Sequence, residues 1–144
     1  MSSTLLALQG FVAVLNAEFG AGLAQDGAGP VVVETGSGRI VSLAGSPDGV
    51  DLVLSSPLLG LEGPGDVIVL GAALACNLYQ EETCGGAIGL DTHSQLLVLS
   101  WRIASERIDS QDLLVAFTNF CATADRLEQT LTQVLAEFSG AERA

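Results

Sequence analysis

Apolar and polar residues recur along the chain with two different periods, and the change of period outlines the expected elements. In residues 3–19 the apolar side chains stand three and four positions apart, a spacing that aligns them on one face of a helix. These residues are Leu5, Leu8, Val12, Leu15 and Phe19. Phe11 and Val14 widen the apolar stripe, so we expect this helix to contact more than its own core. Gly20 and Gly22 are expected to end it.

Residues 31–55 follow the shorter alternating pattern of β-strands. Two apolar segments, 31–35 and 39–43, flank Gly-Ser-Gly, which predicts a tight hairpin. A third segment, 50–55, alternates apolar and polar residues after a Pro-Asp-Gly turn, so we expect a half-buried strand. Residues 57–65 are rich in glycine and proline and are expected to form a loop.

The second half of the chain predicts a short helix, a second hairpin and a long helix. The short helix is expected from Asp66, its cap, to about Tyr79, and small residues fill its centre. Because small side chains let another backbone approach closely, this helix is a candidate subunit interface, and an ordinary buried helix is the alternative. Segments 85–91 and 95–101 are expected strands joined by a turn at 92–94.

The last helix has the most regular pattern in the chain. Asp109 is its expected cap and Gly140 its expected end. Between them, spacings of four and three residues align one apolar seam, formed by Leu113, Phe117, Phe120, Ala124, Leu127, Leu131, Val134 and Phe138. A continuous seam usually packs in a core. The sequence therefore predicts an α+β fold in the order α-β-β-β-α-β-β-α, with a twisted antiparallel sheet and three helices in a single domain, residues 1–144.

Charge and composition narrow the classes of function. The 144 residues include 17 acidic residues, five arginines and no lysine, which gives a formal charge of −12 at pH 7. Such a surface repels nucleic-acid phosphates and anionic lipid head groups. Because 49% of the residues are hydrophobic, disorder is excluded, and we expect self-association or an apolar patch for a partner. No segment reaches the roughly 20 apolar residues of a membrane span, and the N-terminus lacks the basic start of a signal peptide.

Patterns typical of catalysis or metal binding are weak. A Walker phosphate loop needs a lysine, and neither G-x-G-x-x-G nor G-x-S-x-G occurs. The only histidine, His93, lies in an expected turn, and Cys84 is the nearest thiol in sequence; an enzyme using this pair is the least favoured hypothesis. Cys76, Cys84 and Cys121 lack the spacing of a zinc site, and their odd number favours reduced thiols. We expect no catalytic residue, no cofactor and no metal.

An ordered series of short motifs occupies the second half of the chain. An apolar helix ends in Asn77-Leu78, a glycine-rich strand ends in Gly-Leu-Asp at 89–91, a leucine-rich strand follows at 96–99, and a long helix begins at Asp109. This series resembles the class I chaperones of bacterial type III secretion, the Tir chaperone or CesT-like family. The family more often has an acidic residue and alanine where this chain has Ala75-Cys76. Residues 1–60 resemble it only in element order and apolar content.

The resemblance implies a homodimer in the bacterial cytoplasm, without catalysis or cofactor. Its client would be the N-terminal, non-globular chaperone-binding region of one or a few secreted effectors, kept competent for secretion and delivered to the secretion apparatus, where the secretion-system ATPase is a further partner. From the family's use of the second helix and the adjacent strand pair, we expect a dimer interface that includes Leu70, Leu74, Asn77, Leu78 and Trp101. We expect an effector-binding patch that includes Phe11, Val14, Val41, Leu43, Leu52 and Leu54. Core packing is the alternative for each of these residues.

A small dimeric scaffold of the roadblock or longin type is the second hypothesis. Its supporting feature is the hydrophobic strand, tight turn and second strand at 31–43 after an N-terminal helix. Such a scaffold binds a folded partner. The long terminal helix and the Gly-Leu-Asp hairpin fit it less well.

Overall fold

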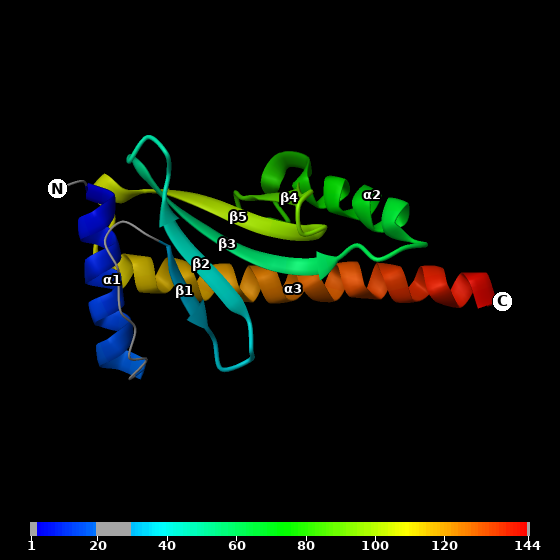
Figure 1. Ribbon diagram of the computed structural model, residues 1–144, viewed down its shortest axis with the longest axis horizontal. Helices are drawn as coiled ribbons and strands as arrows, with labels where there is room; N and C mark the ends of the chain where they lie inside the picture. Colours follow the sequence, from blue (N-terminus) through cyan, green and yellow to red (C-terminus); the bar gives the residue numbers. More distant parts are fainter. Residues whose placement is uncertain (1–2, 20–29, 144) are drawn as a thin grey trace. The chain divides into compact units, whose positions relative to one another are not determined.

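A computed structural model describes residues 3–19 and 30–143 (Figure 1). Its elements are α1 (Ser3–Phe19), β1 (Val31–Glu34), β2 (Ile40–Gly45), β3 (Asp51–Gly60), α2 (Asp66–Asn77), η1 (Leu78–Gln80), β4 (Ala87–Asp91), β5 (Leu96–Ala104), η2 (Ser105–Arg107) and α3 (Ser110–Arg143). The predicted order and the α+β class are therefore confirmed. Gly20 and Gly22, expected to end the first helix, lie outside the described residues.

The five strands form one antiparallel sheet in the order β1-β2-β3-β5-β4. Both predicted hairpins are present: β1 pairs with β2 so that Val33 opposes Val41, and β4 pairs with β5 so that Asp91 opposes Leu96. The turn of the first hairpin needs Gly38, whose φ is 86°, a conformation that glycine adopts without steric cost.

The chain divides into two compact units, and β3, β5 and α3 contribute residues to both. The first unit comprises residues 1–55 and 101–121. Its core joins α1, the first three strands and the start of α3, and two aromatic pairs lie within it. The rings of Phe11 and Phe117 are 5.4 Å apart, and Trp101 meets Phe120 edge-on at 5.3 Å, a geometry that aromatic quadrupoles favour.

The second unit comprises residues 56–100 and 122–144. Its buried apolar side chains come from the end of β3, one face of α2, the β4–β5 hairpin and the C-terminal half of α3. They are Leu58, Val69, Ala73, Cys76, Ile88, Leu97, Leu99, Ala124, Leu127 and Leu131. The seam predicted along α3 is thus buried from Leu113 to Leu131, and Val134 and Phe138 are half-buried. The prediction of one domain over residues 1–144 stays a prediction.

The third strand is longer than predicted. β3 runs through Gly60, where residues 57–65 were expected to form a loop. Its register with β2 ends at Ser55, so Pro57 lies past the segment that pairs with β2. A proline is tolerated in a strand where it removes no ladder hydrogen bond, and its presence alone was therefore a poor loop signal.

Two helix boundaries also differ from the prediction. Gly65, not Asp66, is the N-cap of α2, because its φ of 101° brings the chain into the helix from the left-handed region. α3 does not end at Gly140 but continues to Arg143. A glycine lowers helix stability by about 1 kcal/mol but does not by itself end a helix. Asp109 is confirmed as the cap of α3, since its carboxylate accepts the Asp112 N–H at 2.8 Å.

Candidate protein-interaction site

α2 presents apolar side chains on two opposite faces. One face packs in the second unit through Val69, Ala73 and Cys76. The opposite face carries Val67, Gly71 and Leu74, and Leu78 follows at the start of η1; Val67, Leu74 and Leu78 are 80%, 70% and 62% exposed. A helix that is hydrophobic all round is normally buried on all sides. We call the exposed set of Val67, Gly71, Leu74 and Leu78 the α2 strip.

Exposed apolar side chains continue from the α2 strip into the following elements. Of the eleven large hydrophobic residues exposed in the described chain, six lie on α2, η1 and β4. The members outside the strip are Ile68, Tyr79 and Leu90. Tyr79 is 84% exposed and has a φ of 59°, a conformation that costs energy for a bulky residue. An apolar concentration of this kind marks an interaction surface more often than a free surface.

The residues predicted for the dimer interface occupy different environments. Leu74 and Leu78 are exposed, and Leu70 is half-buried beside them on α2. Asn77 is half-buried and uses its side chain on β4: its amide donates to the Ile88 carbonyl at 2.9 Å and accepts the Ile88 N–H at 2.7 Å. Trp101 belongs to the first unit, where it packs on Phe120. That these five residues form a dimer interface stays a prediction.

Five of the six residues predicted for the effector-binding patch are core residues. Phe11, Val41, Leu43, Leu52 and Leu54 are 0% exposed, and Val14 is half-buried. The location of the predicted patch is therefore corrected. Successive side chains of a strand point to opposite faces, and the prediction selected the face that is buried.

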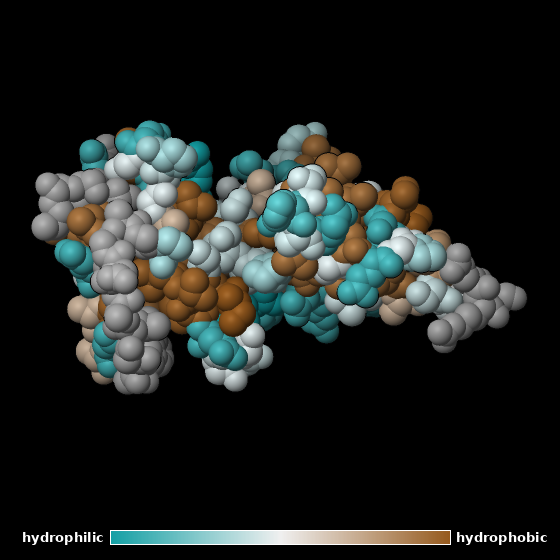
Figure 2. All heavy atoms as spheres, in the orientation of Figure 1, coloured by the Kyte–Doolittle hydropathy of each residue, from teal (hydrophilic) through white to brown (hydrophobic). Residues whose placement is uncertain are grey.

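The other face of the same strands carries the exposed apolar residues of the first unit. Val32 on β1 and Ile40 on β2 are 55% and 41% exposed. Ala44 on β2 opposes Val53 on β3, and both are half-buried. Figure 2 shows a hydrophobic area over β1 and β2. We call the set of Val32, Ile40, Ala44 and Val53 the β face; the sequence missed it because apolar residues occur on both faces of these strands.

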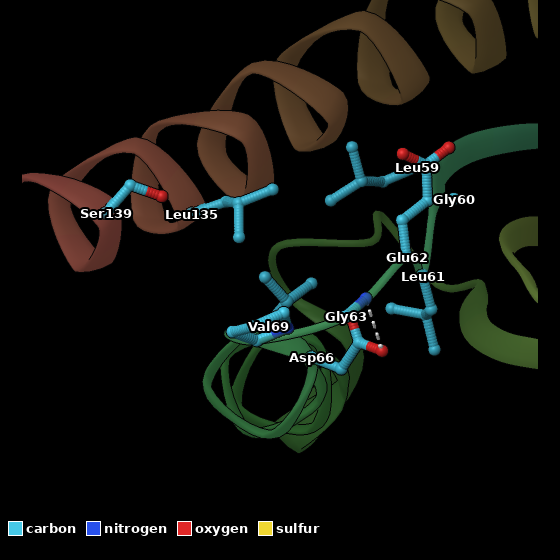
Figure 3. A pocket seen from close by; sticks show the side chains of 10 residues that line it. Leu59, Gly60, Leu61, Glu62, Gly63, Asp66, Val69, Leu135 and Ser139 are labelled. Carbon is cyan, nitrogen blue, oxygen red and sulfur yellow. Dashed lines mark hydrogen bonds between the residues drawn. The ribbon is translucent and has the colours of Figure 1, made fainter. Parts of the chain in front are cut away.

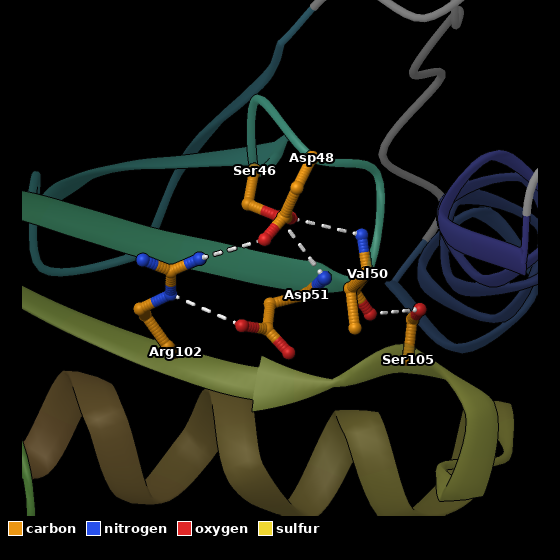
Figure 4. A network of polar contacts seen from close by, with 6 residues as sticks. All are labelled: Ser46, Asp48, Val50, Asp51, Arg102 and Ser105. Atoms are coloured by element: carbon orange, nitrogen blue, oxygen red, sulfur yellow. Dashed lines mark hydrogen bonds and ion pairs between the residues drawn. The ribbon is translucent and has the colours of Figure 1, made fainter.

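A polar network holds the β2–β3 turn against β5 within the first unit (Figure 4). Arg102 donates to the Asp51 carboxylate at 3.1 Å and lies 4.0 Å from Asp48. Asp48 also accepts hydrogen bonds from the Ser46 hydroxyl and from the Val50 N–H. The Ser46 hydroxyl, the Val50 N–H and then Arg102 lower the pKa of Asp48, because each favours the ionised carboxylate. The network therefore positions the β2–β3 turn.

The three cysteines are free thiols that differ in burial: Cys76 is buried, Cys84 exposed and Cys121 half-buried. Cys84 is exposed, and its sulfur lies 3.6 Å from the Thr123 hydroxyl and 3.9 Å from Arg126, whose guanidinium is bound by Glu82 at 2.8 Å. His93 is an exposed turn residue whose backbone N–H donates to Asp91. Burial, followed by the charge of Glu82, raises the pKa of the Cys76 thiol. No group of three metal-ligating side chains occurs in residues 3–19 and 30–143.

Exposed apolar side chains on an acidic α+β chain are typical of a protein-binding protein. The chain belongs to the Tir chaperone protein (CesT) family, whose sequence profile matches residues 7–128. Family membership confirms the resemblance stated from the sequence and the prediction of a chaperone rather than an enzyme. It replaces the roadblock or longin scaffold and the thiol-dependent enzyme as explanations of the chain.

Solved structures of low sequence identity share the fold. A chain of the ExsC–ExsE complex has a TM-score of 0.74 and 15% identity, over 91% of this chain and 97% of that chain. The type III secretion chaperone SycH of Yersinia pestis, in complex with a fragment of YscM2, has a TM-score of 0.59 and 20% identity, over 88% and 98% of the two chains. A chain of the ExoT–SpcS complex of Pseudomonas aeruginosa has a TM-score of 0.58 and 21% identity, over 85% of this chain and 94% of that chain. No curated protein sequence matches the chain. None of the helices described in residues 3–19 and 30–143 is long and apolar enough to cross a membrane.

Proposed function

We propose that this protein is a homodimeric chaperone of the bacterial cytoplasm that binds the N-terminal non-globular region of one or a few type III effectors. It keeps that region competent for secretion and delivers it to the secretion apparatus and its ATPase. The observation that carries the proposal is the presence of two separate apolar surfaces, the α2 strip and the β face, on a chaperone-family chain with a charge of −12.

The α2 strip is suited to a second copy of the chain. A Cβ added at Gly71 would have no neighbouring atom within 4 Å, so the backbone of α2 is open to close approach at its centre. Val67 and Leu74 stand on either side of this opening. In a two-fold dimer each contact occurs twice, and each large apolar side chain that becomes buried contributes about 1.5–3 kcal/mol.

The β face is suited to an extended client segment. Among the described strands, β1 stands at one end of the order, so its outer edge can pair with an extended peptide that places alternate side chains on the adjacent face. Val32 and Ile40 offer the apolar contacts there. SycH, whose structure shares this fold, is a type III secretion chaperone in complex with a fragment of YscM2, and this supports a protein client for this chain.

The direct test is coexpression of the chain with the N-terminal regions of effectors from its own genome. We expect one such region to copurify with the chain, and light scattering after size exclusion to give the mass of two chains plus client. A monomer that captures none of these regions would contradict the proposal. A dimer that captures no client would support the proposed self-association and contradict the proposed effector binding.

A further inference from the structure

A groove in the second unit lies between the end of β3, the start of α2 and the C-terminal part of α3 (Figure 3). Its volume is about 330 Å³, near the lower limit for sites that enclose ligands. Leu59, Val69 and Leu135 converge on it from these three elements. The groove therefore has room and apolar walls for a side chain from a partner.

The wall next to α2 is fixed by direct packing of backbone on α3. A Cβ at Gly65 would lie 2.8 Å from a Leu135 methyl carbon and 3.0 Å from the ring of Phe138. Gly65 also has a φ of 101°, a backbone conformation that glycine adopts without steric cost. A preformed groove binds more tightly than one that must be ordered first.

The groove lies on the flank of α2 away from the α2 strip. Asp66 and Val69 line the groove and are three residues apart, which places them on one side of the helix. Val67 and Leu74 are seven residues apart and exposed on the other side. A partner that covers the strip would therefore leave the groove accessible.

The rim of the groove is acidic. Glu62 and Asp66 both line it, and the Asp66 carboxylate accepts the Gly63 N–H at 3.3 Å. The ion pairs described for this chain join Arg102 and Arg126 to other acidic residues. Two carboxylates beside an apolar groove favour a cationic group next to the apolar one.

We propose that this groove binds an extended client segment in which a leucine-like side chain stands next to an arginine or lysine. The apolar side chain fills the space between Leu59, Val69 and Leu135, and the cation meets Glu62 and Asp66. This inference rests on the proposed function and deepens it, because it states the chemistry that a client segment carries.

The test uses the full chain and the synthetic peptide acetyl-Gly-Ser-Leu-Arg-Ser-Gly-amide, followed by two-dimensional amide NMR. We expect saturable shifts confined to residues 59–69 and 135–139. Replacing the peptide's leucine by serine should abolish these shifts, and replacing its arginine by glutamate should weaken them. Absence of shifts with the parent peptide, shifts only at other residues, or equal binding of the glutamate peptide would overturn the proposal.

A charge variant with a matched control completes the test. Glu62→Gln combined with Asp66→Asn should weaken binding of the arginine-containing peptide about three- to tenfold. The effect is modest because exposed ion pairs are individually weak. Glu81→Gln combined with Glu106→Gln removes two charges from exposed positions outside the groove and should retain the affinity. An equal loss in both variants would mean that overall charge, not the groove, attracts the peptide, and would overturn the proposal. Peptide-independent shifts that grow with protein concentration would identify a second copy as the occupant.

Failure of this inference is distinguishable from failure of the proposed function. Capture of an effector region and the mass of the complex are measured on the unmodified chain, without the peptide. A chain that captures an effector but shows no groove shifts contradicts the groove alone. A chain that shows groove shifts but captures no effector contradicts the proposed function alone.

Discussion

The side-chain amide of Asn77 makes two hydrogen bonds with the backbone of Ile88, accepting its N–H at 2.7 Å and donating to its carbonyl at 2.9 Å. Ile88 opposes Leu99 on β5, and β4 is the last strand in the sheet order. In an antiparallel strand, the N–H and C=O of one residue point to the same side. Asn77 therefore occupies the place of a neighbouring backbone and satisfies part of a free sheet edge.

This relationship explains two motifs that the sequence presents as separate. The Asn-Leu pair at the end of α2 and the glycine-rich strand ending in Gly-Leu-Asp meet through Asn77 and Ile88. A shorter or longer helix would move the amide away from the strand. The spacing of eleven residues between them is thus set by the connection through η1 and the following turn.

Replacing Asn77 by alanine is expected to destabilise the fold by about 1–3 kcal/mol, because it leaves a half-buried N–H and C=O without partners. Urea unfolding followed by circular dichroism measures the change. The control is Gln111→Ala on the exposed surface of α3, which should change stability by less than about 0.5 kcal/mol. Equal stability of the two variants would mean that water replaces the Asn77 amide without cost.

Leu74→Asp is expected to convert the proposed dimer into a folded monomer. Leu74 is 70% exposed, so a charge there does not disturb the core but opposes burial against a second copy. Combining it with Leu70→Asp should have the same effect, with some loss of stability because Leu70 is half-buried. Light scattering after size exclusion gives the mass. Val115→Asp, at a 61% exposed site on α3, is the control that should stay dimeric; an unchanged mass for Leu74→Asp would refute the interface.

Val32→Asp combined with Ile40→Asp is expected to abolish capture of an effector region while the dimer remains. Both side chains are exposed on the β face, so the charges meet solvent in the free protein and an apolar client in the complex. Copurification and light scattering give the two readouts. Leu43→Asp tests the corrected prediction, since a charge at a fully buried position should unfold the chain. A folded Leu43→Asp variant that selectively loses the client would restore the original patch.

Gly65→Ala is expected to lower stability by about 1–3 kcal/mol, because alanine at a φ of 101° is strained and its Cβ would meet Leu135. The melting temperature checks this change. Gly36→Ala is the matched control, since a Cβ there has open space and its φ is not positive. A melting temperature as high as that of the control would contradict the close approach of this loop to α3.

The pKa of Asp48 is expected to lie below its ordinary value of 3.8, chiefly because Ser46 donates to it. A carboxylate whose pKa is lower in the folded state stabilises the fold above the unfolded pKa, and that contribution is lost as the pH falls below about 4. Carboxyl NMR titration should show the low midpoint, and Ser46→Ala should raise it. A midpoint unaffected by Ser46→Ala would assign the shift to Arg102 or the Val50 N–H instead.

The sequence predicts the elements well where one face is clearly apolar and the other polar. The seam of α3 has this character, and so does the alternation in residues 50–55. In β1 and β2, however, Val31, Val32 and Val33 follow one another, so the pattern does not distinguish the core face from the β face. Which face of the strand is buried then depends on how α1 and α3 pack, and the sequence of one strand does not reveal that packing.

The two candidate sites of the second unit differ in how far the sequence could predict them. The α2 strip was accessible from the sequence, because a short helix without a polar face needs apolar neighbours on every side. The groove was not, since Leu59, Val69 and Leu135 come from three elements that only the fold brings together. The groove was also missed because residues 57–65 were expected to form a loop, whereas Leu59 lies within β3.

α2 has one apolar face in its own core and another exposed, so a second copy that covers the exposed face would make the stability of the fold depend on protein concentration. If the α2 strip is covered by a second copy, dilution separates the copies and lowers the melting temperature, as expected when association favours the native state. Freshly synthesised chains then pass through a stage in which Val67 and Leu74 are accessible to other chains. The rate at which two copies meet would set how long each remains prone to aggregation.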